Sequence, residues 1–218
     1  MPPRSRPSSI LYWSRRRFAG TLTGALTGTA LTAGTARAAA NPRVVAVPHL
    51  AFGAVVAAIG GDDITVKLDA ALPVATMQLG STPVTVTERL LLKGQGEDRR
   101  NYLDDARNAP KLGAMVRDQL RTRWPELAES FATRHKRWSH DLVRDILRWT
   151  QQLAGAGLRG KRVRDPGGRI YLLEWAGATV TRDGSDAPAG LVRAPTQLRT
   201  ATPASYRQYV QALVDALR

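Results

Sequence analysis

The stretch that decides the fold runs from residue 125 to residue 155 and reads PELAESFATRHKRWSHDLVRDILRWTQQLAG. Large apolar residues recur at helical spacing from Leu127 to Leu153, and basic residues occupy the other side of the pattern. Pro125 suits a first helical turn. A helix from Glu126 to Leu153 would be roughly 40 Å long, which exceeds the width of one small lobe. We therefore predict a rigid linking helix over residues 125–155, with one lobe on each side of it.

The segment before this helix has the pattern of a strand, a helix and a second strand. Val44–Val47 is a β-branched run ended by a proline, which is typical of a buried strand. Small apolar residues from Ala51 to Ile59 end at a Gly-Gly pair, which indicates a helix with a glycine stop. Ile64–Leu68 alternates like a second strand. This order predicts a parallel crossover unit, and we assign residues 41–124 to an N-terminal α/β lobe.

The segment after the linking helix is shorter and more irregular. It contains two short strand candidates, a helix-or-strand candidate over residues 170–175, coil over 182–203 and an amphipathic closing helix from Tyr206 to Leu217. We assign residues 156–218 to a shortened C-terminal α/β lobe. The predicted fold class is thus α/β, with two small lobes built on short parallel sheets, joined by a long backbone helix, and with the second lobe truncated.

The first 40 residues have the composition of an export signal. Arg15, Arg16 and Phe18 form a twin-arginine-type motif after a basic leader, and no charged residue follows until Arg37. Six threonines and four glycines dilute this apolar stretch, and small-residue cleavage sites follow near Ala38 or Ala40. We predict a cleaved twin-arginine-type signal peptide over residues 1–40, a periplasmic mature protein, and no transmembrane segment in it.

Charge and cysteine content exclude several functions. The 218-residue chain has a net charge of +14, but six arginines and no acidic residue lie in the first 40, which leaves +8 for the rest. That excess favours a mildly basic soluble domain over a nucleic-acid-binding protein. The chain has no cysteine, which excludes disulfides, thiolate metal sites and a lipid-modified cysteine. No G-x-S-x-G, H-E-x-x-H or P-loop motif is present, so we do not predict an enzyme.

Several short motifs occur in a fixed order along residues 43–218. They are Val44–Val47 with the following helix and strand, Asp105-Ala106-Arg107-Asn108-Ala109, the set Pro125, Phe131, Arg134, Trp138 and Leu142, Leu158–Lys161 with Tyr171-Leu172, and Ser205-Tyr206. Their order resembles that in the periplasmic metal-binding proteins of zinc and manganese ABC importers. The resemblance implies a receptor that binds zinc or manganese in a cleft between two lobes and delivers it to an ABC permease in the cytoplasmic membrane.

The same resemblance implies that histidines and a carboxylate bind the metal. The position that matches one family histidine holds Asn101, and the position that matches another is Pro166, beside Asp165. His49 follows the first strand at its carboxyl end, the edge that faces the ligand crevice in open α/β sheets. Together with Asp105, these residues form the candidate metal site: His49, Asn101, Asp105 and Asp165.

One feature of the sequence favours a different ligand. Arg99 and Arg100 fall where a metal-binding histidine is expected, and their charge would repel a cation and favour an anion. Two hypotheses therefore stay open. The first is an exported metal receptor; the second is an accessory protein that kept the fold, binds no metal, and takes an anionic ligand or a protein partner.

Overall fold

The long helix is present and unbroken in the computed structural model, which describes residues 42–87, 90–93, 96–195 and 197–218. A short 3-10 turn, η3 (Pro125–Leu127), leads into α3 (Ala128–Gly155), which has 28 residues and a length of about 42 Å. The side chains of α3 that face the interior are those of the apolar stripe, including Phe131, Trp149 and Leu153. The predicted helix is confirmed, and its role as a link between lobes stays a prediction.

The predicted strand–helix–strand unit is also present. β1 (Val44–Val47) pairs in parallel with β2 (Thr65–Leu68), and α1 (Leu50–Gly60) connects them. The sheet continues with β3 (Thr76–Leu79) and β4 (Thr82–Thr85) in the order β2-β1-β3-β4. β3 runs antiparallel to β1 and forms a hairpin with β4. The sheet is therefore mixed, whereas the sequence predicts a parallel sheet.

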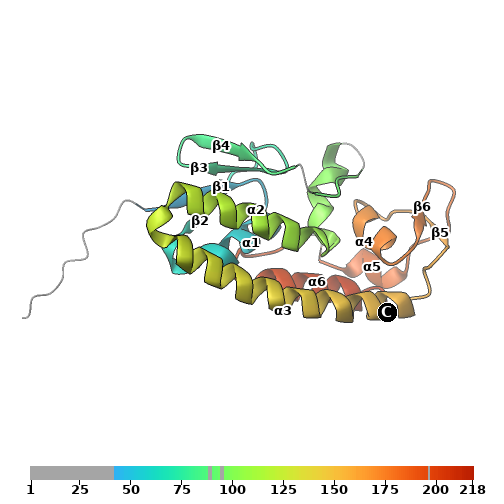
Figure 1. Ribbon diagram of the computed structural model, residues 1–218. Coiled ribbons are helices and arrows are strands. Elements are labelled where there is room, and N and C mark those ends of the chain that lie inside the picture. Colours follow the sequence, from blue (N-terminus) through green and yellow to red (C-terminus); the bar gives the residue numbers. More distant parts are fainter. Residues whose placement is uncertain (1–41, 88–89, 94–95, 196) are drawn as a thin grey trace, which may run out of the picture. The chain divides into compact units, whose positions relative to one another are not determined.

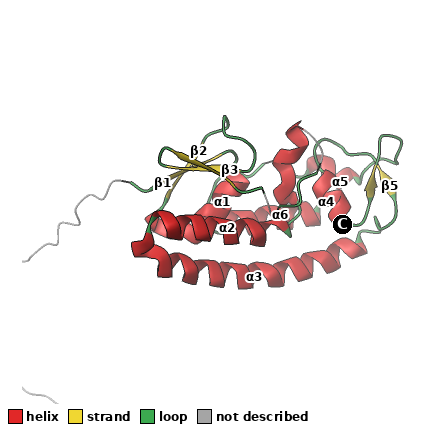
Figure 2. Ribbon diagram, turned by 45° about the horizontal axis from the view of Figure 1, so that its top comes forward, coloured by secondary structure: helices red, strands yellow, loops and turns green. Residues whose placement is uncertain are grey.

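Two helices pack side by side below this sheet (Figures 1 and 2). α2 (Asn108–Arg123) contacts α3 along the turn that contains Gly113. A Cβ atom at Gly113 would lie 2.4 Å from Cζ3 of Trp138, so glycine is needed for the close approach of the indole ring. α1 contacts both helices and is buried along most of its length.

The segments after α3 form a second, smaller α/β arrangement near its carboxyl end (Figure 1). β5 (Arg162–Val163) pairs in parallel with β6 (Thr179–Val180), with α4 (Ile170–Trp175) between them. The predicted coil contains one short helix, α5 (Ala189–Arg193). The closing helix α6 (Ser205–Asp215) lies along α3 in the same direction and contacts it.

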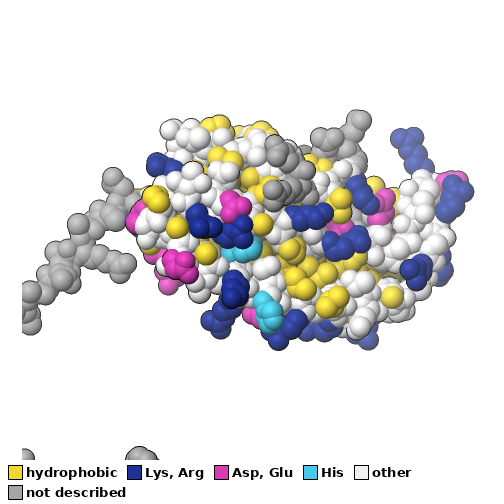
Figure 3. All heavy atoms as spheres, in the orientation of Figure 1, with side chains coloured by type: hydrophobic (Ala, Val, Ile, Leu, Met, Phe, Trp, Pro, Cys, Tyr) yellow, Lys and Arg dark blue, Asp and Glu magenta, His cyan; other side chains and the backbone are white. Residues whose placement is uncertain are grey.

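The α/β class is confirmed, with one small sheet toward each end of α3 (Figure 1). Buried apolar residues from both parts belong to a single core cluster, and residues 39–218 form one compact unit. The division into lobes at residues 41–124 and 156–218 stays a prediction. Residues 1–40, the predicted signal peptide, lie outside the described residues. Lys and Arg side chains are spread over the face shown in Figure 3 and follow α3 along its lower border.

Candidate functional site

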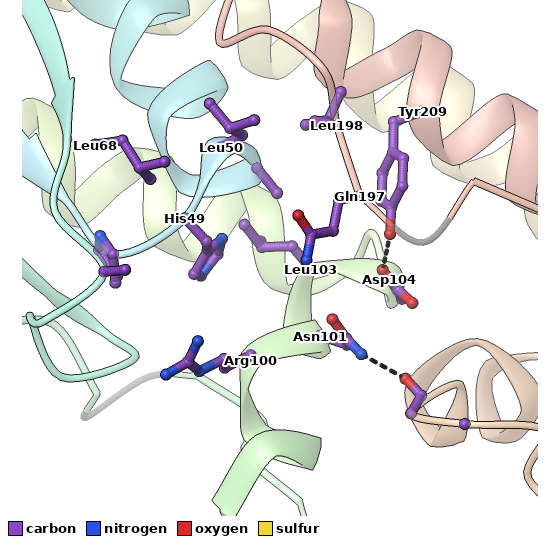
Figure 4. Close-up of a pocket in the computed structure, with 15 residues that line it drawn as sticks. His49, Leu50, Leu68, Arg100, Asn101, Leu103, Asp104, Gln197, Leu198 and Tyr209 are labelled. Carbon is purple, nitrogen blue, oxygen red and sulfur yellow. Dashed lines mark hydrogen bonds between the residues drawn. The ribbon is translucent and has the colours of Figure 1, made fainter.

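A cavity of about 440 Å³ opens where β1 and β2 end (Figure 4). Residues 48–51, 68, 70, 100, 101, 103 and 104 line it from the part of the chain before α3. Residues 167, 168, 197, 198 and 209 line it from the part after α3. Open α/β sheets bind ligands at the carboxyl ends of their strands, and the volume lies in the usual range for small-molecule sites. The cavity is therefore the candidate ligand site.

His49 lines the cavity at the end of β1 and caps α1. Its Nδ1 accepts a hydrogen bond from the backbone N–H of Phe52 at 3.3 Å. Burial, reinforced by the positive charge of Arg100, lowers the pKa of His49 to about 4. The backbone of Val74 opposes that shift in part. His49 is consequently neutral at pH 7, with its proton on Nε2, because Nδ1 acts as an acceptor.

Arg100 and Asn101 approach the cavity from the 3-10 segment η2 (Gly96–Asp104). Asn101 sits at a kink in this segment, and its side-chain N–H donates to the carbonyl of Gly168 at 2.8 Å. This bond joins segments that lie 67 residues apart in the sequence. Asn101 therefore ties the two walls of the cavity together, and its amide oxygen is the atom left to face a ligand.

Asp104 lines the cavity and is buried, with 2% of its surface exposed. Its carboxylate accepts from the hydroxyl of Tyr209 at 2.7 Å and from Nη1 of Arg169 at 3.0 Å. Arg169 is 3% exposed and also donates to the carbonyl of Pro195 at 2.7 Å. Burial raises the pKa of Asp104 to about 6, although Arg169 and Tyr209 favour its charged form. This network connects η2, the start of α4 and α6.

The two carboxylates predicted to bind metal have other partners. Asp105 is buried and accepts two side-chain hydrogen bonds from Arg107, at 2.8 and 2.7 Å. Asp165 accepts from the backbone N–H groups of Gly167 and Arg169 at 2.9 and 2.8 Å, and so holds the turn before α4. Neither residue lines the cavity. Of the four predicted site residues, the structure brings His49 and Asn101 together at the cavity and does not bring Asp105 or Asp165 there.

Sequence reasoning did not find the buried pair of Asp104 and Arg169. In the sequence, Asp104 is one of two adjacent acidic residues before a helix, and such residues usually cap the helix. Arg169 follows a Gly-Gly turn, a context typical of exposed residues. A separation of 65 residues leaves no local signal for the pairing.

Within the described residues, no group of three or more His, Cys, Asp or Glu side chains is arranged to hold a metal ion. His135 and His140 both lie on α3, where His135 is 3.4 Å from Arg117 and His140 is 3.7 Å from Asp141. Neither lines the cavity. His49 is thus the one histidine of the described chain at this site. No helix in the described ranges is both long and apolar enough to span a membrane.

Comparisons with known proteins identify similar folds at low identity. No protein-family model and no curated protein matches the chain. The Zn(II)-bound ZnuA-like domain of AdcA from Streptococcus pneumoniae is 17% identical, with a TM-score of 0.49, and the match covers 65% of this chain and 66% of that one. Zn(II)-bound AdcA from the same species is 12% identical, with a TM-score of 0.44 and coverage of 65% and 39%.

The metal-dependent lipoprotein YcdH from Bacillus subtilis is 10% identical, with a TM-score of 0.44 and coverage of 65% of this chain and 66% of that one. This chain thus spans between 39% and 66% of the solved chains it resembles. At these identities the similarity concerns the arrangement of the chain alone, and it assigns no ligand and no partner to this protein.

Proposed function

We propose that this chain is an exported solute-binding-type protein that captures a small ligand in the cavity at the ends of β1 and β2. One observation carries the proposal: segments from both sides of α3 meet around this cavity, and the Asn101–Gly168 hydrogen bond joins them. The affinity of such a site for a ligand can change when the two walls move relative to each other, as it does in hinged binding proteins. The proposal takes the chain as a binding protein and not as an enzyme.

Export and delivery form the second part of the proposal. The twin-arginine-type leader, cleaved near Ala38 or Ala40, would bring the protein to the periplasm. By its resemblance to importer receptors, the protein would then dock on an ABC permease in the cytoplasmic membrane.

Zinc or manganese is the ligand that the resemblance implies, and the donor set at the cavity does not fit it. A transition-metal site needs several imidazole or carboxylate ligands. Here His49 stands beside Arg100, and the carboxylate of Asp104 is engaged by Arg169 and Tyr209. This observation favours the second candidate function, an accessory protein with the same cavity that binds an anionic ligand or a protein partner in place of a metal.

Ligand-induced thermal stabilisation tests the proposal. The purified protein is screened against divalent metals, carboxylates, amino acids and inorganic phosphate, beside an Ala70→Trp variant. Ala70 is an exposed residue at the cavity, so the indole would obstruct the site without entering the core. We expect at least one ligand class to raise the melting temperature of the wild type and not that of the variant. No stabilisation by any class, or equal stabilisation of both proteins, would contradict a binding role for this cavity.

A further inference from the structure

The exposed face of α3 is basic over residues 133–154. The exposed residues in this span are basic, apolar or uncharged polar, and no carboxylate is among them. Six of them lie within an arc of about 140° at 3.6 residues per turn. We call these six residues the basic face: Lys136, Arg137, Val143, Arg144, Leu147 and Arg148. Figure 3 shows Lys and Arg side chains along the lower border of the molecule, where α3 lies in Figure 1.

Two aliphatic side chains stand among these cations. Val143 is 46% exposed and Leu147 is 63% exposed. Their i, i+4 spacing makes them neighbours on the helix surface, and Arg144 and Arg148 follow them directly in the sequence. One exposed aliphatic residue is ordinary. A helix face that presents Lys and Arg beside exposed aliphatic residues is suited to a bilayer surface, because the cations meet the headgroups and the apolar side chains enter the layer below.

Two cations of the basic face have no counter-charge in the described chain. The side chains of Lys136 and Arg137 are exposed and make no hydrogen bond or ion pair with another described residue. They lie on adjacent positions one and a half turns before the aliphatic pair. Both are therefore free to bind an anionic group outside the chain.

The two other cations are paired but remain accessible. Arg144 pairs with Asp141, and Arg148 pairs with Asp145 at 2.9 Å. Asp145 is buried and also binds Arg207 of α6. The two arginine side chains of the basic face are 67% and 55% exposed, and a guanidinium group has five N–H donors. With these partners included, five cations stand against two carboxylates, which leaves a net charge of +3.

The shape of this surface favours a bilayer over a protein partner. α3 lies along the outer edge of the described chain in both ribbon views, with no other element beyond it (Figures 1 and 2). Residues 133–154 form a ridge about 32 Å long. A protein partner would need a rigid groove that matches the ridge and its charges, with pockets for the protruding side chains. The headgroup layer of a bilayer deforms around protruding side chains and presents anionic groups along the whole ridge.

We propose that the basic face of α3 binds to the surface of a membrane that contains anionic phospholipids. Lys136, Arg137 and the two arginines bind lipid phosphates, and Val143 and Leu147 enter the boundary between headgroups and acyl chains. For the exported protein proposed above, this contact would hold the protein at a membrane surface. The inference does not depend on a ligand in the cavity.

Co-sedimentation with lipid vesicles tests this binding. The protein used is the compact unit of residues 39–218, because the six arginines of residues 1–40 would themselves bind anionic lipids. We expect binding to vesicles of equal parts phosphatidylglycerol and phosphatidylcholine, and far weaker binding to phosphatidylcholine alone. Raising NaCl from about 0.1 M to about 1 M shortens the Debye length from roughly 10 Å to roughly 3 Å, so most of the binding should be lost. Equal binding to both kinds of vesicle would overturn the role of the cations.

Two double variants locate the contact. Lys136→Gln with Arg137→Gln should weaken vesicle binding about 25-fold, since each cation near an anionic bilayer contributes about fivefold. Lys67→Gln with Arg182→Gln makes the same charge change at exposed positions outside α3 and should leave the affinity nearly unchanged. Equal losses in the two double variants would overturn the basic face, because they would indicate only the net charge of the protein.

Leu147→Ser tests the apolar part of the contact. It keeps every charge and should weaken binding about fivefold, because less apolar surface enters the bilayer. The substituted positions are exposed, so every variant should keep the melting temperature of the wild type. An unchanged affinity in Leu147→Ser would overturn insertion of the aliphatic pair.

Soluble polyglutamate distinguishes a lipid from an acidic protein. Binding of polyglutamate that is lost in the Lys136→Gln, Arg137→Gln variant, with no binding of the wild type to anionic vesicles, would overturn the membrane contact and assign the face to an acidic protein partner. The thermal screen with Ala70→Trp tests the cavity separately, so the proposed function and this inference can fail independently.

Discussion

Removing Arg169 should destabilise the protein strongly, and more at pH 8 than at pH 5. In Arg169→Met the carboxylate of Asp104 stays buried and loses the guanidinium that lies 3.0 Å away. Breaking a buried ion pair by deleting one partner costs about 3–5 kcal/mol, because the remaining charge has no compensation. The carbonyl of Pro195 loses its donor as well. We expect the free energy of unfolding to fall by about that amount at pH 8.

The pH dependence follows from the pKa of Asp104, which burial raises from its ordinary value of 3.8 to about 6. A carboxyl group whose pKa is raised by folding is more protonated in the folded state, so its contribution to stability is present at low pH and lost as the pH rises toward 6. Arg169 opposes the rise, and its removal must raise the pKa further. At pH 5 the carboxyl group is then largely protonated in both proteins, and the loss should be smaller by about 1–3 kcal/mol.

Urea unfolding at pH 5 and pH 8, followed by circular dichroism at 222 nm, measures both values. The matched control is Arg162→Met, which breaks an exposed ion pair with Asp183 of similar length, 2.8 Å, and should cost under about 1 kcal/mol at either pH. Adding Asp104→Asn to Arg169→Met removes the stranded charge, keeps an acceptor for Tyr209, and should restore much of the stability. A loss that is equal at both pH values, or no larger than the control, would refute the reasoning.

Three further outcomes are expected. Replacing Arg15 and Arg16 together by lysine should stop export of a reporter fused to residues 1–40, and continued export would contradict a twin-arginine signal. Gly113→Ala should cost about 1–3 kcal/mol in urea unfolding, because its Cβ would lie 2.4 Å from Trp138; wild-type stability would show that the indole can move away. The pKa of His49 is lowered from 6.5 to about 4, so its contribution is present above pH 6.5 and is lost as the pH falls toward 4. His49→Asn should reduce the acid-side loss of stability by about 3 kcal/mol, and an unchanged loss would count against that pKa.

The helices and the first strands could be predicted from the sequence because their signals are local. The apolar stripe of α3 repeats every three or four residues, and such a stripe must be buried wherever the helix lies. β1 and β2 are short alternating or β-branched runs, and α1 is followed by Gly61, whose φ of 56° favours glycine. β3 was missed because Thr76–Leu79 becomes a strand only through its pairing with β1 and β4.

The candidate site shows the same difference between local signals and contacts that form only in the fold. The sequence determined that His49 stands at the carboxyl end of a strand, since that position follows from local order along the chain. Only the tertiary structure decided which carboxylates remain available: Asp105 and Asp165 bind groups two to four residues away, and Asp104 pairs with Arg169 across 65 residues. The sequence specifies the chemical type of each side chain. Whether that side chain is available to a ligand depends on which neighbours the fold brings within hydrogen-bond distance.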